Sequence, residues 1–351
     1  MSPNSDLMSP AAATKIQQLV HAGATVVMNC LPVKSPGLSD DKKTKQIFDE
    51  ILAGSIQNGG KYKVFPAVYK DSTFDKLGIL KDVIVRDSTG NFANGIAWNH
   101  RTGDGFDIYF LSNQNARQQR LSVSLRSSGH VPELWDPLTG DVRAAGDWKM
   151  QNGRTILPLK LEASGSLFIV LKHPTTQIVA NVNKNWPVAK PLQTLKETWY
   201  VKFDKAFAGP QEPVVFNKLS DWGQNKDGRI KYYSGKASYT QAFNWKKGKG
   251  NSSVWLDLGE VRNLADVYVN GIYCGTAWTY PYRVNIGTAL KNAKNNIKIE
   301  VSNTWANRLI GDHLLPKNKQ TTWTNAPYRL DGKPLLPAGL LGPVKIEELI
   351  Y

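Results

Sequence analysis

The sequence predicts a mainly β protein in which a truncated α/β segment precedes two all-β segments. Helical spacing of apolar residues is confined to the first part of the chain, and an alternation of period two begins near residue 95. Turn signals recur at short intervals through that second stretch. We expect four segments: a partial α/β domain at 1–90, a small antiparallel β-sandwich at 91–174, a linker at 175–195 and a larger β-sandwich at 196–351.

The first segment has the pattern helix, strand, helix. Ser9 suits an N-cap and Pro10 suits the first helical position, which predicts a helix that Gly23 ends. Residues 24–28 form a short apolar run of the kind found in buried parallel strands, and a second helix is predicted at 42–52. Because nothing before the first helix supplies a flanking strand, we expect this α/β unit to be truncated.

The middle segment alternates as an antiparallel sandwich does. Strands are predicted at residues 96–101, 106–111, 121–125 and 167–171. Residues 102–105 have the composition of a hairpin turn, and residues 136–140 place Pro and Gly where a turn needs them. The polar stretch that follows contains Pro187 and Pro191, as is typical of a linker.

The last segment is again all-β and is rich in aromatic residues. Residues 175–351 hold eight of the eleven tryptophans. Strands are predicted at 199–203, 237–243, 253–258, 265–269 and 296–301. The dipeptide Asn270-Gly271 is a preferred sequence for a two-residue hairpin turn, so it predicts a hairpin that joins the strand before it to residues 272–274.

The net charge of +15 is concentrated at the C-terminal side. Residues 175–351 hold 24 basic and 13 acidic side chains, which places +11 of the total charge there. Such an excess can attract nucleic acid or an acidic polysaccharide. The lysines are scattered singly through strands and turns, however, so we expect no nucleic-acid partner.

Composition excludes several other classes. No run approaches the roughly 18 to 20 apolar residues of a membrane-spanning helix, and residues 1–20 lack the features of a signal peptide, so we expect no membrane partner. Cys30 and Cys274 are far apart, and the five histidines lack ligand spacing. We therefore expect no disulfide, no metal site and no cofactor.

Glycoside hydrolysis suits a tryptophan-rich β protein and requires two carboxyl groups roughly 5 to 9.5 Å apart with different protonation states. The candidates are Asp104, Asp107, Glu133, Glu197, Asp257 and Glu260. None has a context that favours catalysis, and Asp104 lies in a turn where Asp is preferred for backbone reasons. We expect no catalytic residue in this chain.

Sugar sites on loops at the edge of a sandwich combine aromatic faces, which stack on pyranose rings, with Asn, Asp and Arg, which fix hydroxyl groups. The residues with this mixture are Trp278, Tyr280, Asn303, Trp305, Asn307, Arg308 and Asp312. The alternative is that both tryptophans, with Tyr282, fill the core and that the asparagines cap turns. A salt bridge would likewise explain the arginine and the aspartate.

Two sets of residues resemble known families. The phrases WLDLGEV (255–261), ADVYVNG (265–271), GTAW (275–278) and NTWANRL (303–309), with residues 235–239 and 281–282, resemble the galactose-binding-like jelly roll of family 2 glycoside hydrolases. The phrases VHAGATVV (20–27), KSPGLS (34–39) and HRTGDGFDIYF (100–110) are similar to α-L-rhamnosidases of glycoside hydrolase family 106. Nearly the whole chain thus resembles the C-terminal half of such an enzyme.

The resemblance implies a galactose-binding-like jelly roll at 196–351 and a flavodoxin-like remnant at 1–90. In family 106 the catalytic acids lie in a (β/α)8 barrel before the matched region, so no residue here inherits a catalytic role. The implied function is that of an accessory region which supports hydrolysis of glycosidic bonds in polysaccharides. The implied partners are a rhamnose-containing glycan or plant polysaccharide and the catalytic barrel of the same parent protein, which is expected in the periplasm or outside the cell.

Two other functions stay open at this point. A stand-alone carbohydrate-binding module would need exposed aromatic side chains and a sugar affinity without any partner. A structural buttress would bury the same side chains against neighbouring domains.

Overall fold

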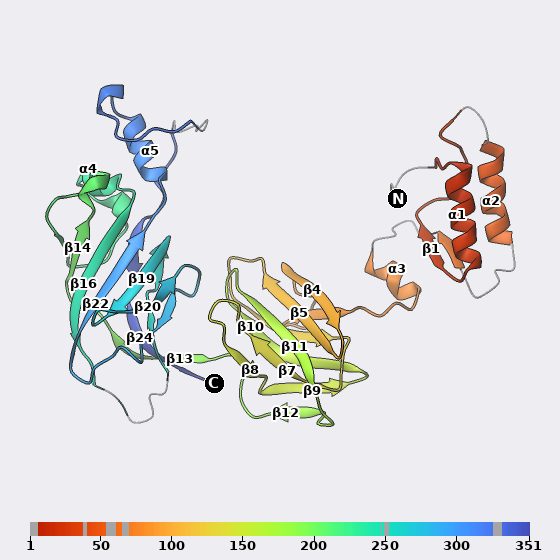
Figure 1. Cartoon of the computed structure of the whole chain (residues 1–351), viewed down its shortest axis with the longest axis horizontal. Coiled ribbons are helices and arrows are strands. Elements are labelled where there is room, and N and C mark those ends of the chain that lie inside the picture. The colour runs from red at the N-terminus through yellow and green to blue at the C-terminus, as the bar shows by residue number, and fades with distance from the viewer. Residues whose placement is uncertain are drawn as a thin grey trace. The chain divides into compact units, whose positions relative to one another are not determined.

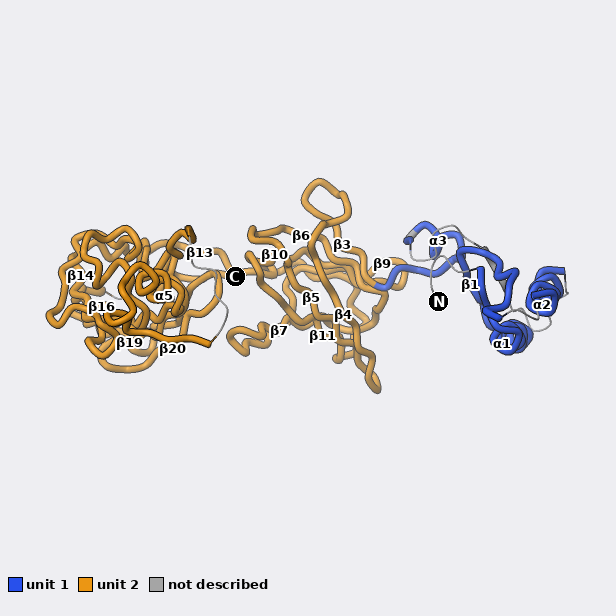
Figure 2. Tube along the Cα trace, turned by 90° about the horizontal axis from the view of Figure 1, so that it is seen from above, with its two compact units in different colours: residues 1–82 blue, residues 83–351 orange. Residues whose placement is uncertain are grey.

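The computed structural model describes residues 6–37, 41–53, 61–64, 70–246, 248, 253–325 and 332–351. In these residues strands predominate, and their sheets are antiparallel apart from one parallel pair near the N-terminus (Figure 1). The chain divides into two compact units, Met1–Asp82 and Val83–Tyr351 (Figure 2). The mainly β fold class predicted from the sequence is confirmed.

Unit 1 contains the predicted helix, strand and helix. Its elements are α1 (Pro10–His21), β1 (Thr25–Met28), α2 (Asp41–Ala53), β2 (Lys61–Val64) and α3 (Asp71–Lys76). The Ser9 side chain caps α1, as predicted, because its hydroxyl oxygen accepts a hydrogen bond of 3.3 Å from the backbone N–H of Ala12. β1 pairs in parallel with β2, a strand that was not predicted from the sequence.

The core of unit 1 lies on α1, α2 and the end of β1. Its buried side chains include Ala13, Val20, Met28, Ile47, Phe48 and Ile51. The prediction that β1 is a buried strand is wrong for most of its length, since Met28 alone of its four residues is buried. A two-stranded sheet in the described residues gives β1 a neighbour on one side only. Leu38 and Ser39 of the matching phrase at 34–39 lie outside the described residues.

Unit 2 begins with the predicted small sandwich, which is made of two five-stranded sheets. The strand orders are β12-β9-β10-β6-β3 and β4-β5-β11-β7-β8. The strands are β3 (Val83–Asp87), β4 (Ile96–Gly103), β5 (Phe106–Asn113), β6 (Gln119–Leu125), β7 (His130–Trp135), β8 (Val142–Ala144), β9 (Asp147–Gln151), β10 (Arg154–Leu161), β11 (Ser166–Pro174) and β12 (Val179–Asn181). The four predicted strands correspond to β4, β5, β6 and β11.

β10 is one of the strands of this sandwich that were not predicted. Its burial alternates, with Leu157, Leu159 and Leu161 in the core. Pro158 argues against an interior strand because proline cannot donate to a ladder. The structure accommodates it opposite Ser122 of β6, and its carbonyl oxygen accepts a hydrogen bond of 2.9 Å from Asn185 Nδ2.

Strands cross the predicted segment boundaries. β3 lies within the predicted α/β segment at 1–90 but pairs with β6 in the sandwich. β12 and β13 (Val188–Thr194) lie within the predicted linker at 175–195, and they pair with β9 and with β24 (Lys345–Ile350). Pro191 favours a linker, but it lies in a strand. β13 is an edge strand with a bulge after Pro191, and a missing N–H is tolerated at such a position.

The rest of unit 2 is a second sandwich of a six-stranded and a four-stranded sheet (Figure 1). The orders are β15-β14-β16-β22-β19-β20 and β13-β24-β17-β21, and β18 pairs with β23. The new strands are β14 (Trp199–Phe203), β15 (Val214–Phe216), β16 (Lys236–Asn244), β17 (Val254–Asp257), β18 (Glu260–Arg262), β19 (Leu264–Val269), β20 (Ile272–Ala277), β21 (Arg283–Asn285), β22 (Lys294–Ser302) and β23 (Gly339–Gly342). The predicted jelly-roll sandwich is confirmed.

The predicted hairpin joins β19 to β20 through Asn270 and Gly271. Both residues have positive φ, of 52° and 82°, as a type I′ turn requires. Asn270 Nδ2 also donates to the Ala289 carbonyl and to Asn295 Oδ1, at 2.8 and 2.7 Å. The turn is thus fixed by its backbone preference and by a side-chain anchor.

Large aromatic side chains fill the space between these two sheets. Trp199, Phe203, Trp222, Tyr233 and Tyr239 are all buried. The Phe203 ring meets Trp222 and Tyr233 edge to face, with centroids 5.3 and 4.9 Å apart. Trp222 Nε1 donates to the Tyr239 hydroxyl at 2.6 Å, and burial raises the pKa of that phenol. The core therefore satisfies these polar atoms internally.

Two glycines with left-handed backbone offer a test of close packing in this sandwich. A Cβ on Gly259 (φ +65°) would lie 2.5 Å from the carbonyl carbon of Gly342, whereas a Cβ on Gly271 (φ +82°) would meet nothing within 4 Å. We expect Gly271→Ala to lower the free energy of unfolding by about 1 kcal/mol and Gly259→Ala by about 3 kcal/mol. Urea unfolding followed by tryptophan fluorescence measures both, and equal losses would contradict the close approach.

Candidate functional site

One end of the six-stranded sheet gathers the candidate residues. Ala277 at the end of β20 pairs with Ala265 of β19, which pairs on its other side with Val301 of β22. β20 and β22 therefore run in the same direction and leave the sheet about 10 Å apart, across β19. Trp278 follows β20, and Trp305 follows β22, so both come from the same end.

The three candidate aromatic side chains at this end are exposed. Trp278, Tyr280 and Trp305 are 61%, 49% and 58% exposed. The alternative that the tryptophans fill the core is therefore wrong for both of them. Tyr282, by contrast, packs partly buried against the core.

Phe207 extends this exposed aromatic group and was not predicted from the sequence. It ends the short turn η2 (Lys205–Phe207) that follows β14, and it is 40% exposed. Its ring lies edge-on to that of Trp305, with centroids 6.2 Å apart. The sequence position of Phe207, shortly after β14, was the only sign that it belongs to this group. β14 ends at Phe203, which pairs with Ala237 at the start of β16, so β14 ends at the same end of the sheet as β20 and β22.

The segment after β22 is a helix and not the predicted loop. α5 (Ala306–His313) contains Asn307, Arg308 and Asp312. These three residues are 2%, 9% and 3% exposed, so the prediction that they face a ligand on a loop is wrong. The helix turns them inward, because positions one turn apart share a face.

The two candidate asparagines bind backbone groups of other segments. Asn303 Oδ1 accepts from the Gly235 N–H, and its Nδ2 donates to the Tyr233 carbonyl, both at 2.9 Å. Asn307 bonds the carbonyl and the N–H of Leu336 at 2.7 and 2.8 Å. Each amide is thus occupied by main chain, which is a structural role close to the capping alternative.

Arg308 and Asp312 also act inside the fold. Arg308 Nη1 lies 3.9 Å from Asp312 Oδ1, and its Nη2 donates to the Phe207 carbonyl at 3.3 Å. Asp312 accepts hydrogen bonds from the backbone N–H groups of Thr321 and Thr322 at 2.9 and 2.7 Å. Burial raises the pKa of Asp312, but these bonds and those of the two hydroxyls outweigh it and hold the pKa below 3.8.

The seven candidates therefore form an exposed aromatic group and a buried polar group. The polar group fixes the main chain beside Phe207 and Trp305, since Arg308 ties Phe207 to α5 and Asn303 ties the end of β22 to the start of β16. Rings on a braced support lose little freedom when a flat ligand stacks on them. The arrangement suits binding of an apolar ring face.

Carboxyl groups of the small sandwich are held by strong partners. Asp107 accepts hydrogen bonds from Ser127 and His100 at 2.7 and 2.9 Å, and Glu133 lies 3.3 Å from Lys172 Nζ. Burial raises the pKa of both groups, but the partners outweigh it, so each pKa is below its ordinary value. A general acid requires the opposite shift.

Glu347 of β24 has a raised pKa. Burial of the side chain raises its pKa, and this effect outweighs the charge of Arg283, which lowers the pKa. Arg283 Nη2 lies 3.1 Å from a carboxylate oxygen of Glu347 and 3.1 Å from one of Asp257. The guanidinium occupies the gap where a glycosidic oxygen would have to lie between two catalytic carboxyl groups. Nothing in the phrase KIEELI (345–350) distinguishes Glu347 from Glu348, so the sequence gives no signal of this burial.

Two features are absent from the described residues, a membrane-spanning helix and a metal-binding cluster. No helix among them is long and apolar enough to cross a membrane. No group of three or more His, Cys, Asp or Glu side chains in that part of the chain is placed to hold a metal ion. In this part of the chain neither Cys30 nor Cys274 is in a disulfide bond.

Two families match this chain. Residues 1–149 match the family model of α-L-rhamnosidases, glycoside hydrolase family 106, and residues 218–329 match the galactose-binding domain-like model of glycoside hydrolase family 2. The second match spans the end of the sheet that carries Trp278 and Trp305. The resemblance predicted from the sequence is confirmed.

Two known proteins are similar over parts of their length. The solved structure of a rhamnosidase from Novosphingobium sp. PP1Y is 31% identical with a TM-score of 0.83, and the match covers 98% of this chain and 32% of that one. A Formosa agariphila protein named as a β-glucuronidase is 32% identical over 204 residues, which are 51% of this chain and 17% of that protein. The chain therefore spans about a third or less of these relatives.

The buried carboxylate of Asp312 yields a pH-dependent prediction. We expect Asp312→Asn to lower the free energy of unfolding by about 2 kcal/mol near pH 7, because two threonine N–H groups lose an ionised acceptor. A carboxyl group with a lowered folded pKa stabilises above its ordinary value of 3.8 and loses that effect as the pH falls through the folded value. The difference from the parent chain should therefore shrink below about pH 4.

Urea unfolding at several pH values measures this difference. Asp104→Asn, at an exposed hairpin position, is the matched control and should change stability little at any pH. A loss at Asp312→Asn that stays constant down to acid pH would contradict the assigned role.

Proposed function

We propose that this chain, which resembles families 106 and 2 of the glycoside hydrolases, is a C-terminal accessory region of an α-L-rhamnosidase-like enzyme. Its jelly roll contacts carbohydrate through the exposed end of the six-stranded sheet. The observation that carries this proposal is the group formed by Trp278, Tyr280 and Trp305, three large rings exposed at that end.

The chemistry of sugars fits such a surface. One face of a pyranose ring presents C–H groups, which stack on aromatic rings, while the hydroxyl groups stay solvated at the rim. A 6-deoxy sugar such as rhamnose adds a methyl group to the apolar face. Phe207, which contacts Trp305, widens the same surface.

The hydrolytic step is assigned to a catalytic barrel of the parent enzyme. The lowered pKa values of Asp107 and Glu133 and the arginine bridge at Glu347 support this assignment, because none of these groups is set up to protonate a leaving oxygen. The parent enzyme would act in the periplasm or outside the cell, on a rhamnose-containing glycan.

A structural buttress is the second candidate function. The same exposed rings favour it, since large exposed aromatic groups also mark contacts between domains. The two functions differ in one measurable respect, because a buttress has no affinity for sugar in the isolated chain.

Sugar binding is tested by removing the rings. We expect Trp278→Ala and Trp305→Ala each to weaken binding of an α-L-rhamnosyl oligosaccharide about fivefold or more, because one stacked ring contributes about 1 kcal/mol. Isothermal titration calorimetry on the full chain measures the affinity. Trp98→Ala removes a 44% exposed indole from β4 and should leave the affinity unchanged. An absence of binding in the parent chain, or no effect of either variant, would favour the buttress.

Hydrolysis is tested separately. We expect the full chain to release no p-nitrophenol from p-nitrophenyl α-L-rhamnopyranoside above the buffer rate, because Asp107, Glu133 and Glu347 are held by cationic or hydroxyl partners. Turnover that Glu347→Gln abolishes and Asp104→Asn preserves would contradict the assignment of catalysis to the barrel.

A further inference from the structure

The outward face of the six-stranded sheet carries an open groove of about 490 Å³. It lies toward the Asn270-Gly271 hairpin, away from the end that carries Trp278. Its lining residues are Tyr200, Thr240, Gln241, Ala242, Tyr268, Gly271, Asn296, Ile297 and Lys298. The lining contains two aromatic rings, several small or polar groups and one charged group.

The register of four strands produces this groove. Tyr200 of β14 lies opposite Thr240 of β16, which lies opposite Lys298 of β22, and Lys298 lies opposite Tyr268 of β19. The two tyrosines are therefore about 14 Å apart, at three strand spacings. Aromatic rings stand at both ends of this row, with Thr240 and Lys298 between them. Tyr273 of β20 continues the row beside Tyr268, with ring centroids 5.4 Å apart.

Lys298 supplies the charge of the groove. Its Nζ lies 4.1 Å from the centre of the Tyr268 ring, in a cation–π contact, and 3.2 Å from a carboxylate oxygen of Glu300. Two further cations, Lys202 and Lys294, are exposed on the same face, since each is separated from a groove residue of its strand by an even number of positions. The surroundings of the groove are therefore cationic.

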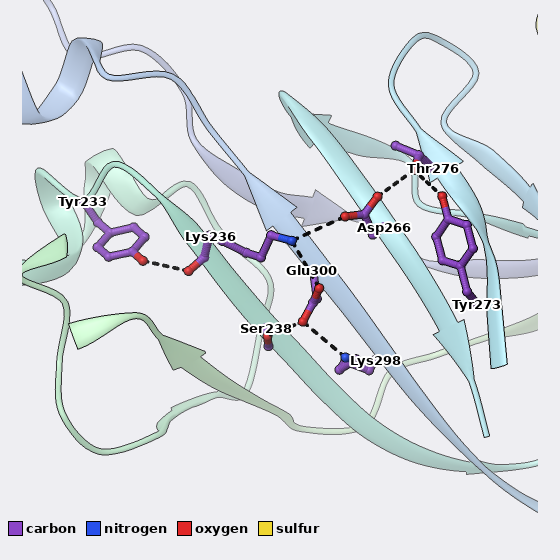
Figure 3. Close-up of polar contacts among 8 residues, drawn as sticks. All are labelled: Tyr233, Lys236, Ser238, Asp266, Tyr273, Thr276, Lys298 and Glu300. Carbon is purple, nitrogen blue, oxygen red and sulfur yellow. Dashed lines mark hydrogen bonds and ion pairs between the residues drawn. The ribbon is translucent and has the colours of Figure 1, made fainter. Parts of the chain in front are cut away.

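The acidic side chains of this face are neutralised beside the groove (Figure 3). Asp266 and Glu300 lie opposite each other on β19 and β22, and Lys236 Nζ lies 3.6 and 3.4 Å from their carboxylates. Neither residue lines the groove. Asp266 also accepts a hydrogen bond of 2.6 Å from Thr276, whose hydroxyl contacts that of Tyr273 at 2.7 Å. This network holds Tyr273 in place. Lys298, which is paired with Glu300, is the charged group of the groove lining.

The chemistry of the lining selects an occupant. A docked apolar helix would need aliphatic anchors, but Ile297 is the aliphatic branched residue of the lining and it is buried in the sheet. An oligosaccharide offers a ring face to Tyr200 and hydroxyl groups to Thr240 and Asn296. A carboxylate on one of its sugars would meet Lys298, in agreement with the +11 charge of residues 175–351.

We infer that this groove binds an acidic oligosaccharide, one that contains uronic acid residues. Tyr200 stacks on one of its rings, and Lys298, held over the Tyr268 ring, pairs with a sugar carboxylate. The site is separate from the aromatic group at the end of the sheet, so it stands or falls independently of the proposed rhamnose contact. It would let the domain hold an anionic glycan while the other surface engages a different part of the same polymer.

The test uses the full chain and a short, fully de-esterified oligogalacturonate as the probe. We expect binding by isothermal titration calorimetry that weakens as sodium chloride rises from about 50 to about 500 mM, because the ion pair is screened. Tyr200→Ala and Lys298→Gln should each weaken binding about tenfold. Reduction of the probe's carboxyl groups to the neutral oligogalactose should have an effect similar to that of Lys298→Gln.

Two control variants show whether binding is specific to this groove. Lys317→Gln removes an equal charge from the exposed turn η4 (Lys317–Lys319), beyond α5, and should leave oligogalacturonate binding unchanged. Trp278→Ala should also leave it unchanged, while Lys298→Gln should preserve binding of the rhamnosyl oligosaccharide. Circular dichroism and thermal unfolding of each variant confirm that the fold persists.

Four results would overturn the inference. These are an absence of oligogalacturonate binding by the parent chain, equal affinity for the neutral probe, an equal loss at Lys317→Gln, or a loss at Trp278→Ala with none at Tyr200→Ala. The last result would move the glycan to the end of the sheet and would leave the proposed function intact.

Discussion

The register of the six-stranded sheet is the constraint on which both proposed surfaces depend. It sets Ala277, Ala265 and Val301 side by side, so the segments after β20 and β22 emerge at one end. The same pairing places Lys298 beside Tyr268 on the outward face. Because successive side chains alternate between faces, a slip of one residue in β22 would turn Lys298 into the core and disrupt both surfaces together. The two proposed binding surfaces thus depend on the same backbone pairing.

Much of the fold follows from local patterns that the sequence displays. Alternation predicted β14 and β22 closely, and Asn270-Gly271 predicted its hairpin because few other residues tolerate that backbone. One failure has its cause in proline. Pro191 favours a linker, yet it lies in β13. A proline destabilises a strand only where its missing N–H would have donated to a neighbouring strand. Which strands are neighbours is set by the tertiary structure, which the local sequence does not show.

The candidate site was harder to predict because burial is a property of the whole domain. Trp199 and Trp278 both lie in or beside strands, yet they are 2% and 61% exposed. The sequence named Trp278 and Trp305 as candidates but could not choose between core and surface. Arg308 and Asp312 were wrongly predicted to contact a ligand, because the segment was expected to be a loop. α5 has no side-chain N-cap, so the sequence contains no signal for the start of this helix. Phe207 had no local signal beyond its place after a strand.

The position of β24 bears on how the domain is made. This strand, Lys345–Ile350, lies between β13 and β17 in the interior of the four-stranded sheet and contributes the buried Ile346 to the core. The small sandwich has all its strands once residue 181 has left the ribosome, so it can fold during synthesis. The jelly roll completes its four-stranded sheet only once residues 345–350 have emerged, because β24 joins β13 to β17. The strands that carry its aromatic core, from β14 onward, are therefore all made before the strand that joins the two edges of the opposite sheet.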